Sequence, residues 1–286
     1  MIYKKSTFLY GIIDYIKLLL YNIVKHNILE GNPMIKSIKQ IKEEFENTKI
    51  TNIPKLIEAY KNDNRKGVEN IINSYKNKLI KYNKEILRIE NMKTYEKQAY
   101  LQGKKLIAGI DEVGRGPFAG PVVTACVILP ENFNILEIND SKKLSPQKRK
   151  ELFFKIKENA IEVSINMEDN NVIDNINILE ATKKSMLKNI HSLVNKPDYI
   201  ILDSVKLNID IPHISMDKAD EKSITVASAS IIAKVTRDEY MQKINEIYPQ
   251  YKFDINKGYG TKEHIEALKK YGPCPIHRKT FIKKYI

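Results

Sequence analysis

The sequence predicts an α/β fold in which acidic side chains lie at the ends of buried strands. Residues 106–129 read as a strand, a glycine-rich turn and a second strand, because apolar runs flank the turn and the second run is rich in β-branched residues. A further apolar run, residues 199–202, ends in Asp203. Segments with the 3.6-residue apolar spacing of helices separate these strands.

The composition is that of a globular protein with a basic charge balance. The chain has 286 residues, 42% of them hydrophobic and 29% charged, and a formal net charge of +13. Such an excess favours a polyanionic partner, nucleic acid first and an anionic membrane surface second. The two cysteines, Cys126 and Cys274, match neither a zinc spacing nor a disulfide framework, which is the usage expected in a reducing cytosol.

Residues 1–33 form an extension of doubtful status. The apolar stretch 8–24 is interrupted by Asp14, Lys17 and Asn22, so it is too short and too polar for a membrane span. An amphipathic helix on a membrane surface is one alternative. The preferred interpretation is an over-extended start, with Met34 as the true first residue.

Residues 34–100 are predicted to form a small, basic, helical accessory segment. Apolar side chains keep helical spacing in three stretches, residues 35–45, 56–60 and 68–92. The sequence leaves two functions open. One is a packed extension with a solvated lysine face, and the other is an auxiliary grip on nucleic acid.

Residues 101–286 form the main domain, and its first strand ends in Asp111 and Glu112. Adjacent residues on a strand point to opposite faces, so both acids cannot enter one core without partners. Ionised carboxylates at a buried strand end need a cation, and a divalent metal is the usual one. An acidic pair fraying into solvent is the alternative, which the Gly-Arg-Gly-Pro turn and the second strand disfavour.

The elements after residue 129 alternate between helices and strands. Ser145 and Pro146 have the chemistry of a helix N-cap and first residue. Residues 161–167 alternate as a strand, and residues 177–194 predict a helix that begins with capping-box spacing.

A long helix is predicted from Ser223 to about Ile247, and a short one over residues 262–271. Asp220 precedes the long helix, where an acid could serve as a cap. Capping is therefore the structural alternative to a metal-binding role for Asp220.

The acids come from separate elements of a basic protein that has no Cys-His or Ser-His nucleophile signature. Magnesium and manganese prefer carboxylate and water ligands. In a two-metal site, one ion activates the attacking water and the other stabilises the leaving oxygen of a phosphodiester. The residues by themselves therefore predict metal-dependent phosphodiester hydrolysis.

Six motifs occur in order within residues 105–281: GIDEVGRGPFAGPVV, NDSKKLS, YIILDSVKL, DKAD followed by SASIIAKVTRD, NKGYGTKEH and GPCPIHRKTF. Together they resemble the type 2 ribonucleases H, and specifically the bacterial ribonuclease HII family. Residues 64–68 also look like part of the N-terminal extension of some bacterial members. Arg115 separates the chain from ribonuclease HIII, which typically has threonine there.

The resemblance implies an RNase H-like mixed sheet flanked by helices, with a small helical N-terminal extension. It assigns the catalytic, metal-binding role to four acids, which are Asp111, Glu112, Asp203 and Asp220. Ala219 stands where many members carry glycine, but the acid that follows it is kept.

The resemblance also implies the residues that bind the substrate. Gly114, Arg115 and Gly116 would contact the ribose 2′-hydroxyl, since glycines let the main chain approach the sugar and this hydroxyl distinguishes RNA from DNA. Tyr259 would stack on the sugar that follows a ribonucleotide, and the alternative is a turn tyrosine packed on the core. The implied phosphate contacts come from Arg115, Lys142 and Lys143.

We therefore expect an endoribonuclease that hydrolyses the RNA strand of RNA–DNA hybrids and incises DNA 5′ of embedded ribonucleotides by two-metal hydrolysis with Mn²⁺ or Mg²⁺. Its role would be ribonucleotide removal in DNA replication and repair. The alternatives are a ribonuclease HIII-like hybrid nuclease and a non-catalytic nucleic-acid-binding protein of the same fold. We expect a cytoplasmic monomer without stable membrane association, although tethering through residues 8–25 is a remaining alternative.

Overall fold

The computed structural model describes residues 36–286. The predictions for residues 1–33, including the membrane-surface helix and the start at Met34, lie outside the described residues. Between residues 36 and 286, no helix combines the length and the apolar character needed to cross a membrane. The chain divides into two compact units, of which the first ends at Lys81 and the second comprises Tyr82–Ile286.

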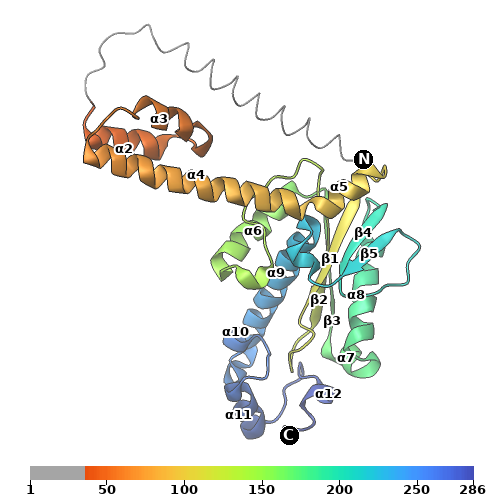
Figure 1. Ribbon diagram of the computed structural model, residues 1–286. Coiled ribbons are helices and arrows are strands. Elements are labelled where there is room, and N and C mark those ends of the chain that lie inside the picture. Colours follow the sequence, from red (N-terminus) through yellow and green to blue (C-terminus); the bar gives the residue numbers. More distant parts are fainter. Residues whose placement is uncertain (1–35) are drawn as a thin grey trace. The chain divides into compact units, whose positions relative to one another are not determined.

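The first unit is helical, as predicted (Figure 1). It contains α2 (Ile38–Asn47), α3 (Ile53–Ala59) and the N-terminal part of α4 (Lys66–Met92), which continues into the second unit. Ser37 and Gln40 form a reciprocal capping box at the start of α2. The apolar faces meet in one small core, made of Ile41, Phe45, Ile53, Val68, Ile72 and Tyr75.

A five-stranded mixed sheet forms the second unit's centre, in the order β3-β2-β1-β4-β5. The strands are β1 (Ile107–Val113), β2 (Val122–Ile128), β3 (Glu162–Glu168), β4 (Tyr199–Asp203) and β5 (His213–Met216). Pairing is antiparallel from β3 to β1 and parallel from β1 to β5. The predicted mixed sheet is therefore confirmed.

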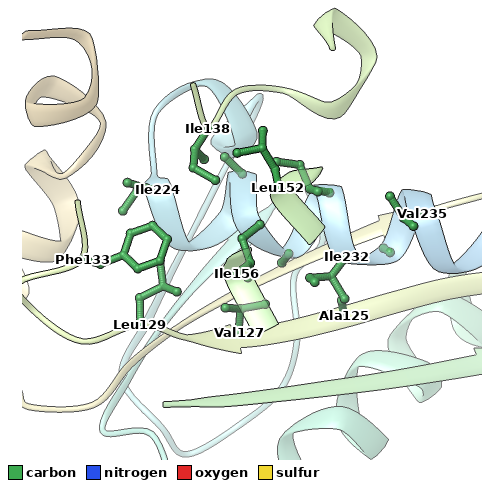
Figure 2. Close-up of a cluster of buried hydrophobic side chains, with 14 of the residues drawn as sticks. Ala125, Val127, Leu129, Phe133, Ile138, Leu152, Ile156, Ile224, Ile232 and Val235 are labelled. Atoms are coloured by element: carbon green, nitrogen blue, oxygen red, sulfur yellow. The ribbon is translucent and has the colours of Figure 1, made fainter. Parts of the chain in front are cut away.

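Helices pack on both faces of this sheet. Side chains on β2 point alternately to the two faces, so this strand contacts helices on each side. Ala125 and Val127 contact a cluster that includes residues of α6 (Pro146–Asn159) and α9 (Ile224–Ile247) (Figure 2). Cys126 and Ile128 face Met186 and Ile190 of α8 (Ile178–Ser192) instead. On β1 the same alternation turns Asp111 toward the face that α9 covers.

The remaining elements of the second unit are short apart from α11. They are α5 (Thr94–Leu101), η2 (Ser141–Lys143), α7 (Asn170–Ile176), η3 (Ala219–Glu221), η4 (Pro249–Tyr251), α10 (Phe253–Asn256), α11 (Lys262–Tyr271) and α12 (Lys279–Ile282). Ser145 caps α6 and Ser223 caps α9, each through its side-chain oxygen. Neither α7 nor β5 was predicted, since seven and four residues are too few to show a clear period.

Candidate active site

Two parallel strands bring the first and third predicted acids to one edge of the sheet. The last paired residues of β1 and β4 are Ile110 and Leu202. Asp111 and Asp203 follow them directly, so both carboxylates leave the sheet at the same edge. Glu112 comes one residue later on β1, which is still paired with β2 there.

Asp111 is only 5% exposed. Burial raises the pKa of its carboxyl well above the usual range, and the charges of Glu112 and Asp203 raise it further. A hydrogen bond from Ser230 of α9 and the main-chain N–H of Glu112, 2.8 Å from Oδ1, oppose this shift. Ionising the buried Asp111 carboxyl therefore costs free energy unless a cation binds beside it.

Glu112 has one partnered and one free oxygen. Oε1 lies 3.2 Å from Nη1 of Arg115, whereas Oε2 is buried and has no hydrogen-bond partner among the described residues. Burial raises the pKa of this carboxyl, and Asp203 contributes to the rise while Arg115 and Lys142 oppose it. A buried carboxylate oxygen without a partner is available to a metal ion.

Asp220 lies in η3, next to the residue that holds Asp203 in place. The main-chain N–H of Ala219 donates to Oδ1 of Asp203 at 3.0 Å. Asp220 is 4% exposed, and burial together with the charges of Asp140 and Asp203 raises its pKa to about 6. Capping of α9 is the work of Ser223, whose Oγ accepts from Val226 N. The capping alternative for Asp220 is therefore not realised.

Lys142 and Lys143, the two lysines implied as phosphate contacts, have different acidic partners. Nζ of Lys142 lies 3.9 Å from Oδ2 of Asp220, and its side chain is 80% exposed. Burial lowers the pKa of Lys142, but the surrounding acids, led by Asp140, outweigh burial and leave that pKa raised. Lys143 is instead paired with Glu221 at 3.0 Å. Lys142 is thus the lysine that faces the acids directly.

The four carboxylates repel one another, and the described residues contain no group of three acidic, histidine or cysteine side chains that holds a metal by itself. Magnesium is usually bound by one or two carboxylates and completes its shell with water and substrate phosphates. Hard oxygen donors, a free Oε2 on Glu112 and raised carboxyl pKa values fit such an ion. Asp111, Glu112, Asp203 and Asp220 are the residues that would hold it.

Two fully buried arginines shape the loop that follows the acids. Arg278 donates to the carbonyl oxygens of Gly114 at 2.6 Å and Arg115 at 2.9 Å. Arg237 packs on the other side, and a Cβ on Gly114 would lie 2.3 Å from its Nε. Gly114 also has φ +92°, a conformation that favours glycine. The Gly114–Gly116 loop is therefore held by side chains from α9 and the C-terminus.

Arg237 also connects the segment that follows this loop to the turn that carries Tyr259. Arg237 donates to Ala119 O at 3.1 Å, to Pro121 O at 2.9 Å and to Lys257 O at 2.8 Å. Tyr259 is 42% exposed. A Cβ on Gly116 would lie 3.8 Å from its Cε1, so the ring lies beside the glycine loop rather than within the core.

Four residues of this arrangement were missed from the sequence. Asp140 and Ser230 adjoin the acids, and Arg237 and Arg278 support the loops. Asp140 could have been noticed, because it stands two residues before Lys142 in a motif that was already singled out. The two arginines stand inside the motifs SASIIAKVTRD and GPCPIHRKTF, and nothing in those motifs shows that they are buried.

The comparisons with known proteins agree with this geometry. Residues 108–284 match the family model described as Ribonuclease HII, and residues 37–100 match the Ribonuclease HII N-terminal domain. A ribonuclease HII of Caldanaerobacter subterraneus is 54% identical over 204 residues, which cover 71% of this chain and 85% of that protein. One of Acetivibrio thermocellus is 54% identical over 210 residues, 73% of this chain and 82% of the relative.

Solved structures show the same fold. The ribonuclease H2 of Pyrococcus horikoshii superimposes with a TM-score of 0.55 at 30% identity, covering 63% of this chain and 96% of that structure. The RNase HII in a PCNA:RNase HII complex from Archaeoglobus fulgidus gives 0.51 at 28% identity, over 60% and 93% of the two chains. The similarity thus extends over nearly the whole of these two relatives.

Proposed function

Because this chain belongs to the ribonuclease HII family, we propose that its acidic site hydrolyses the RNA strand of RNA–DNA hybrids and cuts duplex DNA on the 5′ side of an embedded ribonucleotide. The family consists of endonucleases that use a divalent metal, Mn²⁺ or Mg²⁺. The proposal adds which residues carry out the reaction and how a ribonucleotide is distinguished from its DNA neighbours.

One observation carries the proposal. Asp111 and Glu112 precede the Gly114–Gly116 loop with only Val113 between them, so a sugar bound at the loop would place its own phosphate beside these two carboxylates. Glu112 and Arg115 are even in direct contact, 3.2 Å apart. Cleavage next to the sensed 2′-hydroxyl is the outcome that this proximity favours.

The chemistry follows from the charges. Asp111, Glu112, Asp203 and Asp220 would hold a divalent ion, which would supply Lewis-acid stabilisation of the phosphoryl oxygens. Arg115 and Lys142 bind substrate phosphates, since both are cations at the rim of the acidic cluster. Ser230 and the main-chain N–H of Glu112 hold the Asp111 carboxylate, and the main-chain N–H of Ala219 holds that of Asp203.

Discrimination is assigned to the Gly114–Gly116 loop and to Tyr259. The loop offers main-chain groups without a side chain in the way, and Gly116 leaves room beside the Tyr259 ring. An exposed aromatic ring can stack on a nucleic acid sugar or base. Lys143 contributes a more distant phosphate contact once it leaves Glu221.

The cellular setting is part of the same proposal. We propose a monomer that acts in the cytoplasm on ribonucleotides left in DNA by replication and repair. The basic net charge of +13 supports association with nucleic acid.

The test is cleavage of a labelled DNA duplex that contains one ribonucleotide, with Mg²⁺ or Mn²⁺ and with EDTA. We expect a metal-dependent nick 5′ of the ribonucleotide, which Asp111→Asn abolishes and Asp210→Asn, a change at an exposed acid, leaves intact. Cleavage of long RNA tracts in hybrids but not at a single ribonucleotide would instead indicate the specificity of a ribonuclease HIII. Tight hybrid binding without cutting would indicate a non-catalytic binding protein.

A further inference from the structure

Two buried histidines near the C-terminus have no part in the proposed chemistry. His264 on α11 is 0% exposed and His277, in segment 274–278, is 2% exposed. Their Nε2 atoms lie 2.9 Å apart. The rings of Tyr251 and Phe253 pack around them, with centroids 4.9 Å from His277 and 5.4 Å from His264.

The partners at both ends of the pair determine where its protons lie. The carbonyl oxygen of Tyr259 can only accept, and it lies 2.9 Å from Nδ1 of His264, which therefore carries a proton. Nε2 of a neutral His264 then accepts, so Nε2 of His277, 2.9 Å away, donates to it. Nδ1 of a neutral His277 is left as an acceptor, and Cys274 N–H donates to it at 2.9 Å, while Cys274 Sγ and O lie farther away, at 3.1 Å and 3.2 Å.

Both imidazoles must be neutral in this chain. Burial lowers the pKa of His264, and burial together with the neighbouring His264 lowers the pKa of His277 to about 4. A proton added to the shared position would make two N–H groups face each other. The chain thus links Cys274 to the main chain of Tyr259 in one fixed geometry.

The segment that holds His277 also supports the glycine loop. His277 forms an isolated antiparallel β-bridge with Ala119, and Arg278 N donates to Phe118 O at 2.8 Å. The Arg278 side chain reaches Gly114 O at 2.6 Å. Asn170, at the start of α7, fixes the segment from behind by donating to His277 O at 3.1 Å. Consecutive residues therefore attach to the two elements that the proposed function assigns to ribose sensing and to stacking.

We propose that His264 and His277 are positioning residues that hold Tyr259 in register with the Gly114–Gly116 loop, and so set the preference for a single embedded ribonucleotide over a long RNA strand. This inference rests on the proposed function. A lone ribonucleotide needs the loop and the tyrosine to act on adjacent sugars at the same time. A long RNA strand offers a 2′-hydroxyl at every position and tolerates a displaced tyrosine.

The test compares kcat and KM on a duplex with one ribonucleotide and on a long hybrid. His277→Phe keeps a ring of similar shape but removes both hydrogen bonds. His277→Gln is the rescue variant, because its amide N–H can replace Nε2–H. Leu268→Ala is the matched control. Leu268 lies on α11 in the buried cluster that contains Tyr251 and Phe253, and its side chain takes no part in the hydrogen bonds of the two histidines.

We expect His277→Phe to lower kcat/KM on the single-ribonucleotide duplex by about 10- to 100-fold, the scale of a misplaced binding group, and on the long hybrid by less than about 3-fold. The ratio of kcat/KM on the single-ribonucleotide duplex to kcat/KM on the long hybrid should be mostly restored in His277→Gln. Leu268→Ala should leave this ratio unchanged. Equal losses on both substrates, or the same shift in ratio from Leu268→Ala, would overturn the proposal.

A spectroscopic measurement tests the chain without relying on activity. In ¹⁵N-labelled wild type at pH 7, the ring nitrogen shifts should report a proton on Nδ1 of His264 and on Nε2 of His277. The same tautomer on both rings, or a charged ring, would overturn the chain itself. If wild type makes no metal-dependent nick, the proposed function fails and the role in substrate preference fails with it, whereas correct nicking with an unaltered ratio in His277→Phe refutes only the positioning role.

Discussion

The guanidinium of Arg278 donates to the carbonyl oxygen of Gly114 at 2.6 Å, although 164 residues separate the two in the chain. Arg278 also reaches Arg115 O and Gly120 O, so its donors end on main-chain carbonyls rather than on an acid. A buried cation thereby defines the shape of a loop that we assign to ribose recognition. Arg278, near the C-terminus, consequently supports the loop to which we assign ribose recognition.

Replacing this guanidinium tests that dependence. Arg278→Lys keeps the charge but cannot reach three carbonyls, so at least one stays buried without a partner. We expect the free energy of unfolding to fall by roughly 2–4 kcal/mol, and cleavage next to a single ribonucleotide to weaken. Urea titration measures the first effect. Lys279→Arg, at the exposed neighbouring position, is the control, and unchanged stability in Arg278→Lys would contradict the role.

The two glycines of the loop should respond differently to alanine. At Gly114 a Cβ would lie 2.3 Å from Arg237 Nε and the residue has φ +92°, so Gly114→Ala should lower the melting temperature and distort the loop. At Gly116 the nearest neighbour of an added Cβ is Tyr259 Cε1 at 3.8 Å, so Gly116→Ala should fold normally.

Activity assays complete this comparison. Gly116→Ala should still raise KM for ribonucleotide substrates, because the added methyl group stands where the sugar approaches. Equal melting temperatures for the two variants would show that Arg237 moves aside, and normal KM in Gly116→Ala would argue against its place in the substrate site.

The acidic cluster should cost stability in the absence of metal. Asp111 is buried beside the charges of Glu112 and Asp203, which raise its pKa. Asp111→Asn removes one source of repulsion, and we expect the metal-free protein to gain about 1 kcal/mol of unfolding free energy while losing cleavage. Asp210→Asn should change neither quantity. A less stable Asp111→Asn protein would mean that its hydrogen bonds outweigh the repulsion.

Divalent metal should stabilise the wild-type protein even without substrate. An ion that binds only the folded state adds RT ln(1 + [L]/Kd), which is about 2.7 kcal/mol at 100 times Kd. We expect Mn²⁺ to raise the melting temperature of wild type in proportion, EDTA to reverse the rise, and Asp203→Asn to reduce it. A shift that survives in Asp203→Asn would place the ion elsewhere.

The histidine pair predicts how stability changes with pH. The pKa of His277 falls from its usual 6.5 to about 4 on folding, because of burial and His264. Between these values the unfolded chain binds a proton that the folded chain does not. The stability that neutral His277 contributes is therefore fully present above pH 6.5 and is lost as pH falls toward 4.

Measuring urea unfolding of wild type and His277→Phe across this range isolates the effect. The advantage of wild type over the variant should shrink by roughly 3 kcal/mol between pH 7 and pH 4. His264, Cys274 and Tyr251 face the ring and are unchanged in both proteins. A constant difference would indicate that His277 is already charged or exposed in the folded state.

The sequence by itself predicted four of the five strands, most of the helices and three of the candidate acids. β1, β2 and β4 carry unbroken apolar runs, and Asp111, Glu112 and Asp203 stand where those runs end. Such signals are local, because a strand or helix of sufficient length records its own buried face in its spacing. The motifs added Asp220 and the ribose-reading loop by resemblance.

Only the tertiary structure decided which polar groups support that site. In the sequence, Arg237, Arg278, His264 and His277 are members of separate motifs with no role assigned to them. Their partners lie far away in the chain, at Pro121, Gly114 and each other. A buried polar side chain is stable only when its hydrogen bonds are satisfied, and the groups that satisfy it are assembled by folding rather than by neighbouring sequence.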